Sequence, residues 1–178
     1  LDKLAFKPFP SVGQVHAPVD AVRAILEGEG LDPSAVTSVT IRTTQTVKDH
    51  VGWDYEPADV MSAQANVQYA VAALLVDGEV TVGAYTETAI AREAILARID
   101  DVAVVVDESL ADETFGAVAV VEADGERYEA AVETPRGYPE NPMSPADLEA
   151  KFRRQAGHAL DDDAVDRVDA ILCKWLAA

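Results

Sequence analysis

The stretch AVAVVEADGERYEAAVET, residues 117–134, decides the fold class of this chain. Residues 117–122 and 127–134 have the composition of two β-strands. Between them stand Asp124 and Gly125, and Asp-Gly is the strongest short-range signal for a β-hairpin. The sequence therefore predicts an antiparallel pair of strands joined by a tight turn.

Two further strands are predicted upstream of this hairpin. Residues 102–106, a run of valines and one alanine, have the pattern of a buried strand. In residues 36–46, Val39, Ile41 and Thr43 alternate with more polar side chains, which predicts a strand with one buried face. Because strands cluster around a hairpin instead of alternating with helices, the pattern favours an α+β fold over a doubly wound α/β fold.

Helices are expected to cover a small sheet. Pro18 and Asp20 mark the start of the first helix, and Gly28 and Gly30 mark its end. The other predicted helices span residues 61–76, 87–99, 144–158 and 163–176. Residues 48–59 are predicted to form a loop that carries His50, Trp53 and Tyr55. We expect a single domain over residues 1–178, with the sheet and its hairpin packed against helices.

Composition and charge exclude several classes of protein. Of the 178 residues, 49% are hydrophobic but only 6% aromatic, so the core must consist mostly of aliphatic side chains. The longest apolar run, residues 69–76, is far shorter than the roughly 20 residues that span a membrane. A net charge of −18 makes binding to nucleic acid or anionic lipid unfavourable. With one cysteine, Cys173, no intrachain disulfide is possible.

The excess of acids over lysines indicates adaptation to a salt-rich cytoplasm, and the alternative is an ordinary acidic protein. There are 18 Asp and 14 Glu but only 5 Lys, and molar salt would screen the resulting repulsion. No signal peptide is visible, so a cytoplasmic location is expected. A start at Leu1, without methionine, suggests the back half of a longer protein or an expressed fragment.

No motif for a metal or an organic cofactor is present. The sequence contains no phosphate-binding glycine loop, dinucleotide fingerprint or nucleophile elbow. Its three histidines, His16, His50 and His158, lie far apart without metal-ligand spacing. We therefore expect neither a cofactor nor a metal.

Lys7 and His16 are the first candidates for chemistry. Lys7 stands in a stiff, proline-flanked segment, and His16 stands just before a helix N-terminus, where free N–H groups favour an anion. The helix dipole would also keep His16 neutral, able to act as a base or hydrogen-bond donor. A carboxylate ligand would suit both residues. The alternative is a surface lysine and a capping histidine.

Two more segments could contribute to a site. Ser62, Asn66 and Tyr69 fall on one face of the predicted helix 61–76 and could read a polyanion, with Tyr69 as a proton donor. The alternative is that Tyr69 is partly buried and the other two are solvated. The proline-rich loop at residues 136–142 is rigid enough to position functional groups, or it is only a structural corner.

Taken in order, these segments resemble the MmgE/PrpD family. The first block is KPFPS from Lys7 followed by HAPVDA from His16, and the second is SAQANVQYAVA followed by LLVDG, residues 62–72 and 74–78. The closing block comprises the Asp-Gly hairpin, PRG and ENPMS in residues 135–144, and then Lys151 with Phe152. The resemblance covers nearly the whole chain, but only the second domain of such proteins.

The resemblance implies a function and an incomplete site. Family members include 2-methylcitrate dehydratase, cis-aconitate decarboxylase and iminodisuccinate epimerase, which act on small di- or tricarboxylates without a cofactor. Their active site lies between an all-helical N-terminal domain, absent here, and a smaller α+β domain, and they are commonly homodimers. From the family, Lys7 is expected to bind or act on a carboxylate, and Tyr69 to belong to the site; His16 carries over more weakly. Ser62 and Asn66 are expected to bind substrate.

The chain also departs from the family pattern. Val12 and Gly13 stand where the family often has a cysteine and a basic residue, and ANVQY, residues 65–69, replaces the usual FSLPY. We therefore expect the C-terminal domain of a lyase, inactive without a helical domain supplied in cis or in trans. A non-catalytic binding or assembly module that keeps the fold is the alternative.

Overall fold

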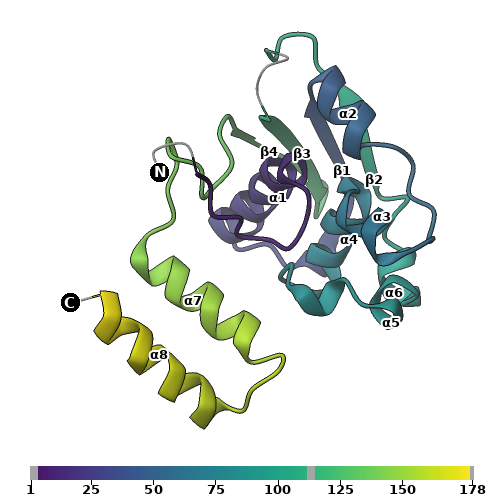
Figure 1. Cartoon of the computed structure of the whole chain (residues 1–178). Coiled ribbons are helices and arrows are strands. Elements are labelled where there is room, and N and C mark those ends of the chain that lie inside the picture. Colours follow the sequence, from purple (N-terminus) through teal and green to yellow (C-terminus); the bar gives the residue numbers. More distant parts are fainter. Residues whose placement is uncertain (1–3, 112–114, 177–178) are drawn as a thin grey trace.

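A four-stranded mixed sheet forms the framework of the chain (Figure 1). The computed structural model describes residues 4–111 and 115–176, with side chains up to residue 172, so the side chain of Cys173 lies outside the described part. The strands are β1 (Val36–Thr43), β2 (Val102–Val106), β3 (Ala117–Ala123) and β4 (Glu126–Val132), in the order β2-β1-β3-β4. Only β1 and β2 are parallel, and the other neighbours are antiparallel. The α+β prediction is confirmed.

The predicted hairpin is also confirmed. Ala123 pairs with Glu126, which leaves Asp124 and Gly125 as the two-residue turn. Their φ angles are 53° and 81°, and two positive φ values define the type I′ turn that suits the twist of paired strands. The strand predicted at residues 36–46 ends earlier, at Thr43.

Eight α-helices surround the sheet in the described residues. They are α1 (His16–Glu29), α2 (Gln45–Val51), α3 (Val60–Gln64), α4 (Val67–Asp77), α5 (Glu87–Ile90), α6 (Glu93–Leu96), α7 (Pro145–Ala156) and α8 (Asp162–Leu176). Short 3₁₀ turns at Gly13–Val15, Pro33–Ala35 and Val82–Ala84 connect some of them. None of the helices described over 4–111 and 115–176 has both the length and the apolarity to cross a membrane.

One loop prediction and two helix predictions were wrong in detail. Residues 48–51 belong to α2 and not to a loop, because the Thr44 hydroxyl accepts a hydrogen bond from the Val47 N–H and starts a helix there. The helix predicted over residues 61–76 is two helices, interrupted at Ala65 and Asn66. The helix predicted over residues 87–99 is likewise split into α5 and α6.

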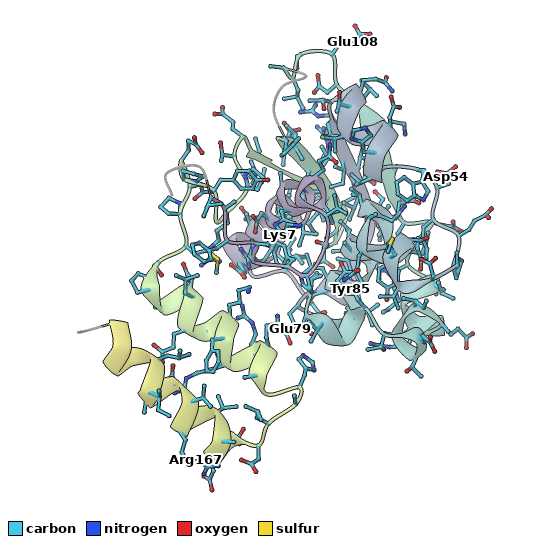
Figure 2. The ribbon with its side chains drawn as sticks, in the orientation of Figure 1. Lys7, Asp54, Glu79, Tyr85, Glu108 and Arg167 are labelled. Carbon is cyan, nitrogen blue, oxygen red and sulfur yellow. The ribbon has the colours of Figure 1, made fainter. Side chains whose placement is uncertain are left out.

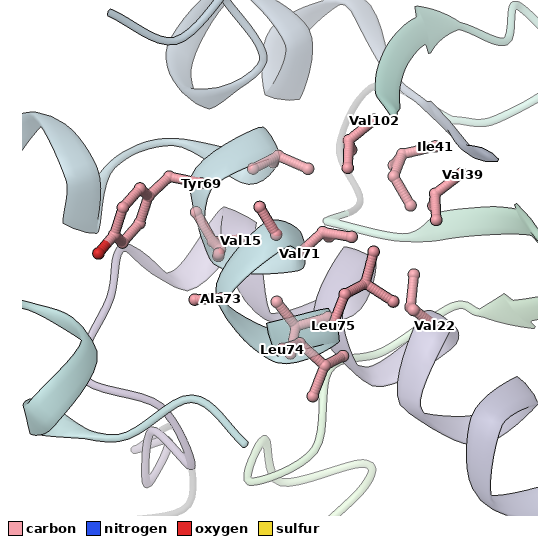
Figure 3. Packing of buried hydrophobic residues seen from close by; sticks show 14 of the residues in the cluster. Val15, Val22, Val39, Ile41, Tyr69, Val71, Ala73, Leu74, Leu75 and Val102 are labelled. Carbon is pink, nitrogen blue, oxygen red and sulfur yellow. The ribbon is translucent and has the colours of Figure 1, made fainter. Parts of the chain in front are cut away.

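The core lies between one face of the sheet and two helices. Helix α1 packs across β3 and β4, and α4 packs on β2 and on α1. Figure 3 shows Leu74 and Leu75 of α4 close to Val22 of α1, with Val39 on the sheet nearby. The opposite face of the sheet is more polar, and Arg42 there pairs with Glu129 and Asp107. This one-sided burial explains the alternation in residues 36–43.

Helices α7 and α8 form an arm beside this core (Figure 1). They pack on each other, and Arg153 of α7 binds Asp166 and Asp169 of α8 at 2.7 and 2.5 Å. Helix α7 buries no residue fully, and Ile171 of α8 is 56% exposed. The arm therefore leaves apolar surface uncovered.

Candidate functional site

A rigid loop holds the segment that carries Lys7. The Phe6 N–H donates to the Gly137 carbonyl at 2.8 Å, and the Gly137 N–H donates to the Asn141 carbonyl at 2.7 Å. Gly137 has φ 92°, and a Cβ there would lie 1.9 Å from the Phe6 carbonyl oxygen, so only glycine fits. On the other side, buried Asp20 of α1 accepts from the Arg136 N–H at 3.1 Å. The proline-rich loop is a structural corner, and it anchors the residue next to Lys7.

Lys7 opens onto a pocket of about 510 Å³. Its walls are the segment from Lys7 to Val12, the end of α3, Val82, and Lys151 and Gln155 of α7. Figure 2 shows Lys7 at the side of the core that faces the arm. The Gln64 amide donates to the Pro10 carbonyl at 2.8 Å, and the Val12 N–H donates to the Gln64 carbonyl at 2.9 Å. These bonds fix the floor of the pocket.

The lining contains no Asp or Glu. On a chain with 32 acids and 14 bases, a pocket lined by two lysines and no acid departs from the average charge of the chain. Lys7 is exposed, and its ammonium donates to the Ser11 carbonyl at 3.2 Å. The pocket is thus suited to a small anion.

His16 lies directly behind this wall and does not line the pocket. It is fully buried, its ring meets Phe9 edge-on at 5.4 Å, and its Nε2 is 3.4 Å from the Ser11 carbonyl oxygen. Burial, with a smaller contribution from the positive charge of Lys7, lowers the pKa of His16 to about 4, so the ring is neutral near pH 7. The structure therefore brings Lys7 and His16 together at one carbonyl, with only Lys7 reaching the pocket.

Tyr69 lies deeper, in a group of three tyrosines. Its ring centroid is 5.0 Å from that of Tyr55 and 5.7 Å from that of Tyr85. The Tyr69 side chain is fully buried and its hydroxyl donates to the Ala84 carbonyl at 2.5 Å. Burial raises the pKa of Tyr69 to about 12. As placed here, Tyr69 supports the core and does not line the pocket, and its catalytic role stays a prediction.

Ser62 and Asn66 do not lie on one face with Tyr69, because the predicted helix is interrupted between them. Ser62 is in α3, where its N–H donates to Asp59 at 2.7 Å. Asn66 is fully buried and caps α4: its side-chain oxygen accepts from the Tyr69 N–H at 3.0 Å, and its amide donates to the Trp53 carbonyl at 2.8 Å. Neither residue lines the pocket. Their predicted role in binding substrate stays untested.

Sequence reasoning missed several residues near the site. Lys151 and Gln155 of α7 and Gln64 of α3 line the pocket without having been assigned a role. Tyr85 is buried beside the Ser11 side chain. Burial raises the pKa of the Tyr85 hydroxyl, and the nearby Ser11 side chain lowers it by a smaller amount. The spacing of Lys151 and Gln155, one helical turn apart, was the available signal, but only the tertiary placement of α7 shows what they face.

Within the described residues, no three His, Cys, Asp or Glu side chains gather closely enough to hold a metal ion. His50 instead contacts the Gln14 amide at 3.1 Å, and the His158 ring lies against Gly83. The lining of the pocket itself contributes the ammonium groups of Lys7 and Lys151 and the amides of Gln64 and Gln155.

Comparison with known proteins agrees with this picture. A family model described as the MmgE/PrpD C-terminal domain matches residues 9–175. The chain is also similar to a cis-aconitate decarboxylase-like protein, oryM, of Aspergillus oryzae, with 28% identity over 169 residues. That match covers 89% of this chain but only 35% of the relative, so the chain spans about a third of the relative's length. The chain belongs to the MmgE/PrpD family and corresponds to its C-terminal domain.

Proposed function

We propose that this domain forms one wall of the active site of a cofactor-independent lyase that acts on a small di- or tricarboxylate. The observation that carries this proposal is the acid-free pocket at Lys7 on a chain of net charge −18. An ammonium pairs with a carboxylate through charge-assisted hydrogen bonds. The name of the Aspergillus oryzae relative points to a tricarboxylate, cis-aconitate, as the kind of molecule bound.

The described residues offer binding groups but an incomplete set of catalytic groups. Removing or delivering a proton next to a carboxylate needs a base, an acid and donors for the developing enolate-like charge. Lys7 can serve as a donor to that charge. His16 is neutral but buried, and the Tyr69 hydroxyl is engaged by a backbone carbonyl. The domain alone is therefore expected to be inactive.

The missing groups would come from a helical domain joined to this one in cis or supplied in trans. The relative is far longer than this chain, which leaves room for such a domain. The chain also exposes apolar side chains, at Leu4 and Phe6 of the N-terminal segment and at Ile171 and Leu172 of α8. Apolar side chains so exposed are typical of a surface that another domain covers.

Among the reactions of the family, we propose dehydration of the 2-methylcitrate type, with decarboxylation and epimerisation as the competing activities. The proposed enzyme would belong to propionate metabolism and act as a cytoplasmic homodimer. The acidic composition supports only one part of this proposal, a salt-rich environment. Replacement of the family's basic residue by Gly13 removes one positive group from the first motif, so the preferred acid can differ from that of other members.

The experiment mixes the whole chain with its candidate helical domain in molar potassium chloride. Consumption of 2-methylcitrate and of cis-aconitate is followed for each component and for the mixture. Turnover only on mixing, lost in Lys7→Ala and kept in Lys48→Ala, is the expected result; Lys48 is a matched control because it lies outside the pocket. Full activity of the Lys7→Ala mixture would remove Lys7 from the site. A folded mixture without activity on any small carboxylate would favour a binding or assembly module.

A further inference from the structure

We propose that Lys151 of α7 is a second carboxylate-binding residue that faces Lys7 across the pocket. The two lysines would hold two carboxylates of one ligand and so select di- and tricarboxylates over monocarboxylates. The inference rests on the proposed function, and it assigns a specificity-determining role to a residue of the C-terminal arm.

The pairing of charges sets the described lysines apart from the arginines. Every arginine in the described part of the chain forms an ion pair with a carboxylate, except Arg167 on α8. Lys7, Lys48 and Lys151 form no ion pair with a described residue, and Lys48 instead donates to the Val104 carbonyl. Acids are more than twice as numerous as bases, yet these three ammonium groups have no acidic partner among the described residues. Two of the three line one pocket.

A second observation comes from the same face of α7. Gln155 lies one turn after Lys151, so both side chains reach the same side of the helix, and both line the pocket. The Oε1 atom of Gln155 is buried and has no hydrogen-bond partner in the described residues. A buried amide oxygen without a partner costs free energy. The Gln155 side chain therefore has a reason to reorient when a ligand enters the pocket, and its amide could then contact a carboxylate of the ligand beside Lys151.

Contacts at both ends of α7 hold Lys151 at the pocket. At the start, Asp147 pairs with Arg136 in the loop that anchors the Lys7 segment. At the end, the His158 ring lies against Gly83, where a Cβ would come within 2.9 Å of the ring. Helix α7 is thus attached to the same loop and the same turn that border the pocket. Its other side, through Arg153, is attached to α8.

Lysine acetylation of the whole chain, read by peptide mass spectrometry, tests the inference. Tricarballylate is the polycarboxylate probe, and propionate and inorganic phosphate serve as controls at matched ionic strength. Lys48 is the internal control for any general effect of the added salt. We expect tricarballylate to slow acetylation of both Lys7 and Lys151 at least about threefold, with Lys48 unchanged and with little effect of propionate or phosphate.

The three other outcomes of the acetylation experiment contradict the proposals in different ways. Protection of Lys7 alone overturns the role of Lys151 and leaves the proposed function standing. Protection of neither lysine overturns both proposals. Equal protection by phosphate assigns the two lysines to a general anion site and overturns their role in selecting polycarboxylates.

Affinity measurements on variants give an independent reading. Lys151→Ala is expected to weaken tricarballylate binding about tenfold, the effect of one lost charge-assisted contact, and to leave propionate binding unchanged. Lys151→Arg, which keeps the charge, is expected to retain most of the affinity. Because Lys151 has no partner in the described residues, unfolding of Lys151→Ala should match that of the unchanged chain. Equal tricarballylate affinity in Lys151→Ala would overturn the inference.

Discussion

Acidification should destabilise the chain through His16. The imidazole is fully buried in the folded chain, where its pKa is about 4, against 6.5 when exposed. Between these two pH values the His16 imidazole is protonated in the unfolded chain but not in the folded chain. The contribution of His16 to the free energy of unfolding is therefore fully present above about pH 6.5. It falls as the pH drops and is lost below about pH 4. The difference in pKa corresponds to about 3 kcal/mol of unfolding free energy.

The variant His16→Gln isolates this contribution from the many carboxylates that also titrate. A glutamine amide does not titrate, and its N–H can still donate to the Ser11 carbonyl that His16 contacts. Urea unfolding of both chains is measured at fixed salt from about pH 7 down to about pH 4. The unchanged chain should lose about 3 kcal/mol relative to His16→Gln over that interval.

A constant difference between the two unfolding curves across this pH range would refute the reasoning. If His16→Gln does not fold, NMR titration of the His16 ring in the unchanged chain gives the same answer. A ring that titrates near pH 6.5 would show that the imidazole is not buried as described. In Lys7→Ala the pKa of His16 should rise, because the positive charge of Lys7 helps to lower it.

Three further predictions concern stability measured by urea unfolding. Gly137→Ala should lower the free energy of unfolding by more than about 2 kcal/mol, because the added Cβ meets a backbone carbonyl. Gly125→Ala, which has a similar positive φ but open space around it, should lower that free energy by about 1 kcal/mol. Equal losses would contradict the close approach. Asn66→Ala should cost about 2 kcal/mol as a buried helix cap, and Ser62→Ala less than about 0.5 kcal/mol; the reverse order would place the cap elsewhere. Tyr69→Phe should cost about 1 to 2 kcal/mol by leaving a buried carbonyl without its donor, and an unchanged stability would argue against that bond.

The parts of the fold that were predicted correctly depend on local signals. The turn at Asp124 and Gly125 is decided by two residues that tolerate positive φ, and the burial of Val39, Ile41 and Thr43 follows from alternation alone. Neither feature requires knowledge of distant parts of the chain. This is why the hairpin and the α+β class could be recognised from the sequence.

The errors in the helices come from competing local signals. Residues 61–76 continue an apolar pattern through Asn66, but the Asn66 side chain binds the backbone of the next turn and starts a new helix there. The sequence of residues 44–51 contains the signals of a short helix: Thr44 as a capping residue, and Val47 and Val51 spaced one helical turn apart. The polar and aromatic residues that follow favoured the prediction of a loop instead.

The candidate site could be proposed from the sequence only where a motif was present. Lys7 was assigned to it through the family motif, the structure places Lys7 at the acid-free pocket, and its role stays a prediction. Lys151 could not be assigned from the sequence, because its place in the same pocket as Lys7 depends on where α7 packs. His16 and Tyr69 are residue types that can transfer protons, but both are buried and neither lines the pocket. The sequence around a single polar residue does not show whether that residue is buried.

Calorimetric titration of the whole chain with tricarballylate tests the central claim most directly. The chain, Lys7→Ala and Lys48→Ala are compared at one fixed ionic strength, with unfolding measured for each. We expect binding by the unchanged chain and by Lys48→Ala, and an affinity about tenfold weaker in Lys7→Ala. Equal binding by Lys7→Ala, or no binding by the folded, unchanged chain, would contradict a polycarboxylate site at this pocket.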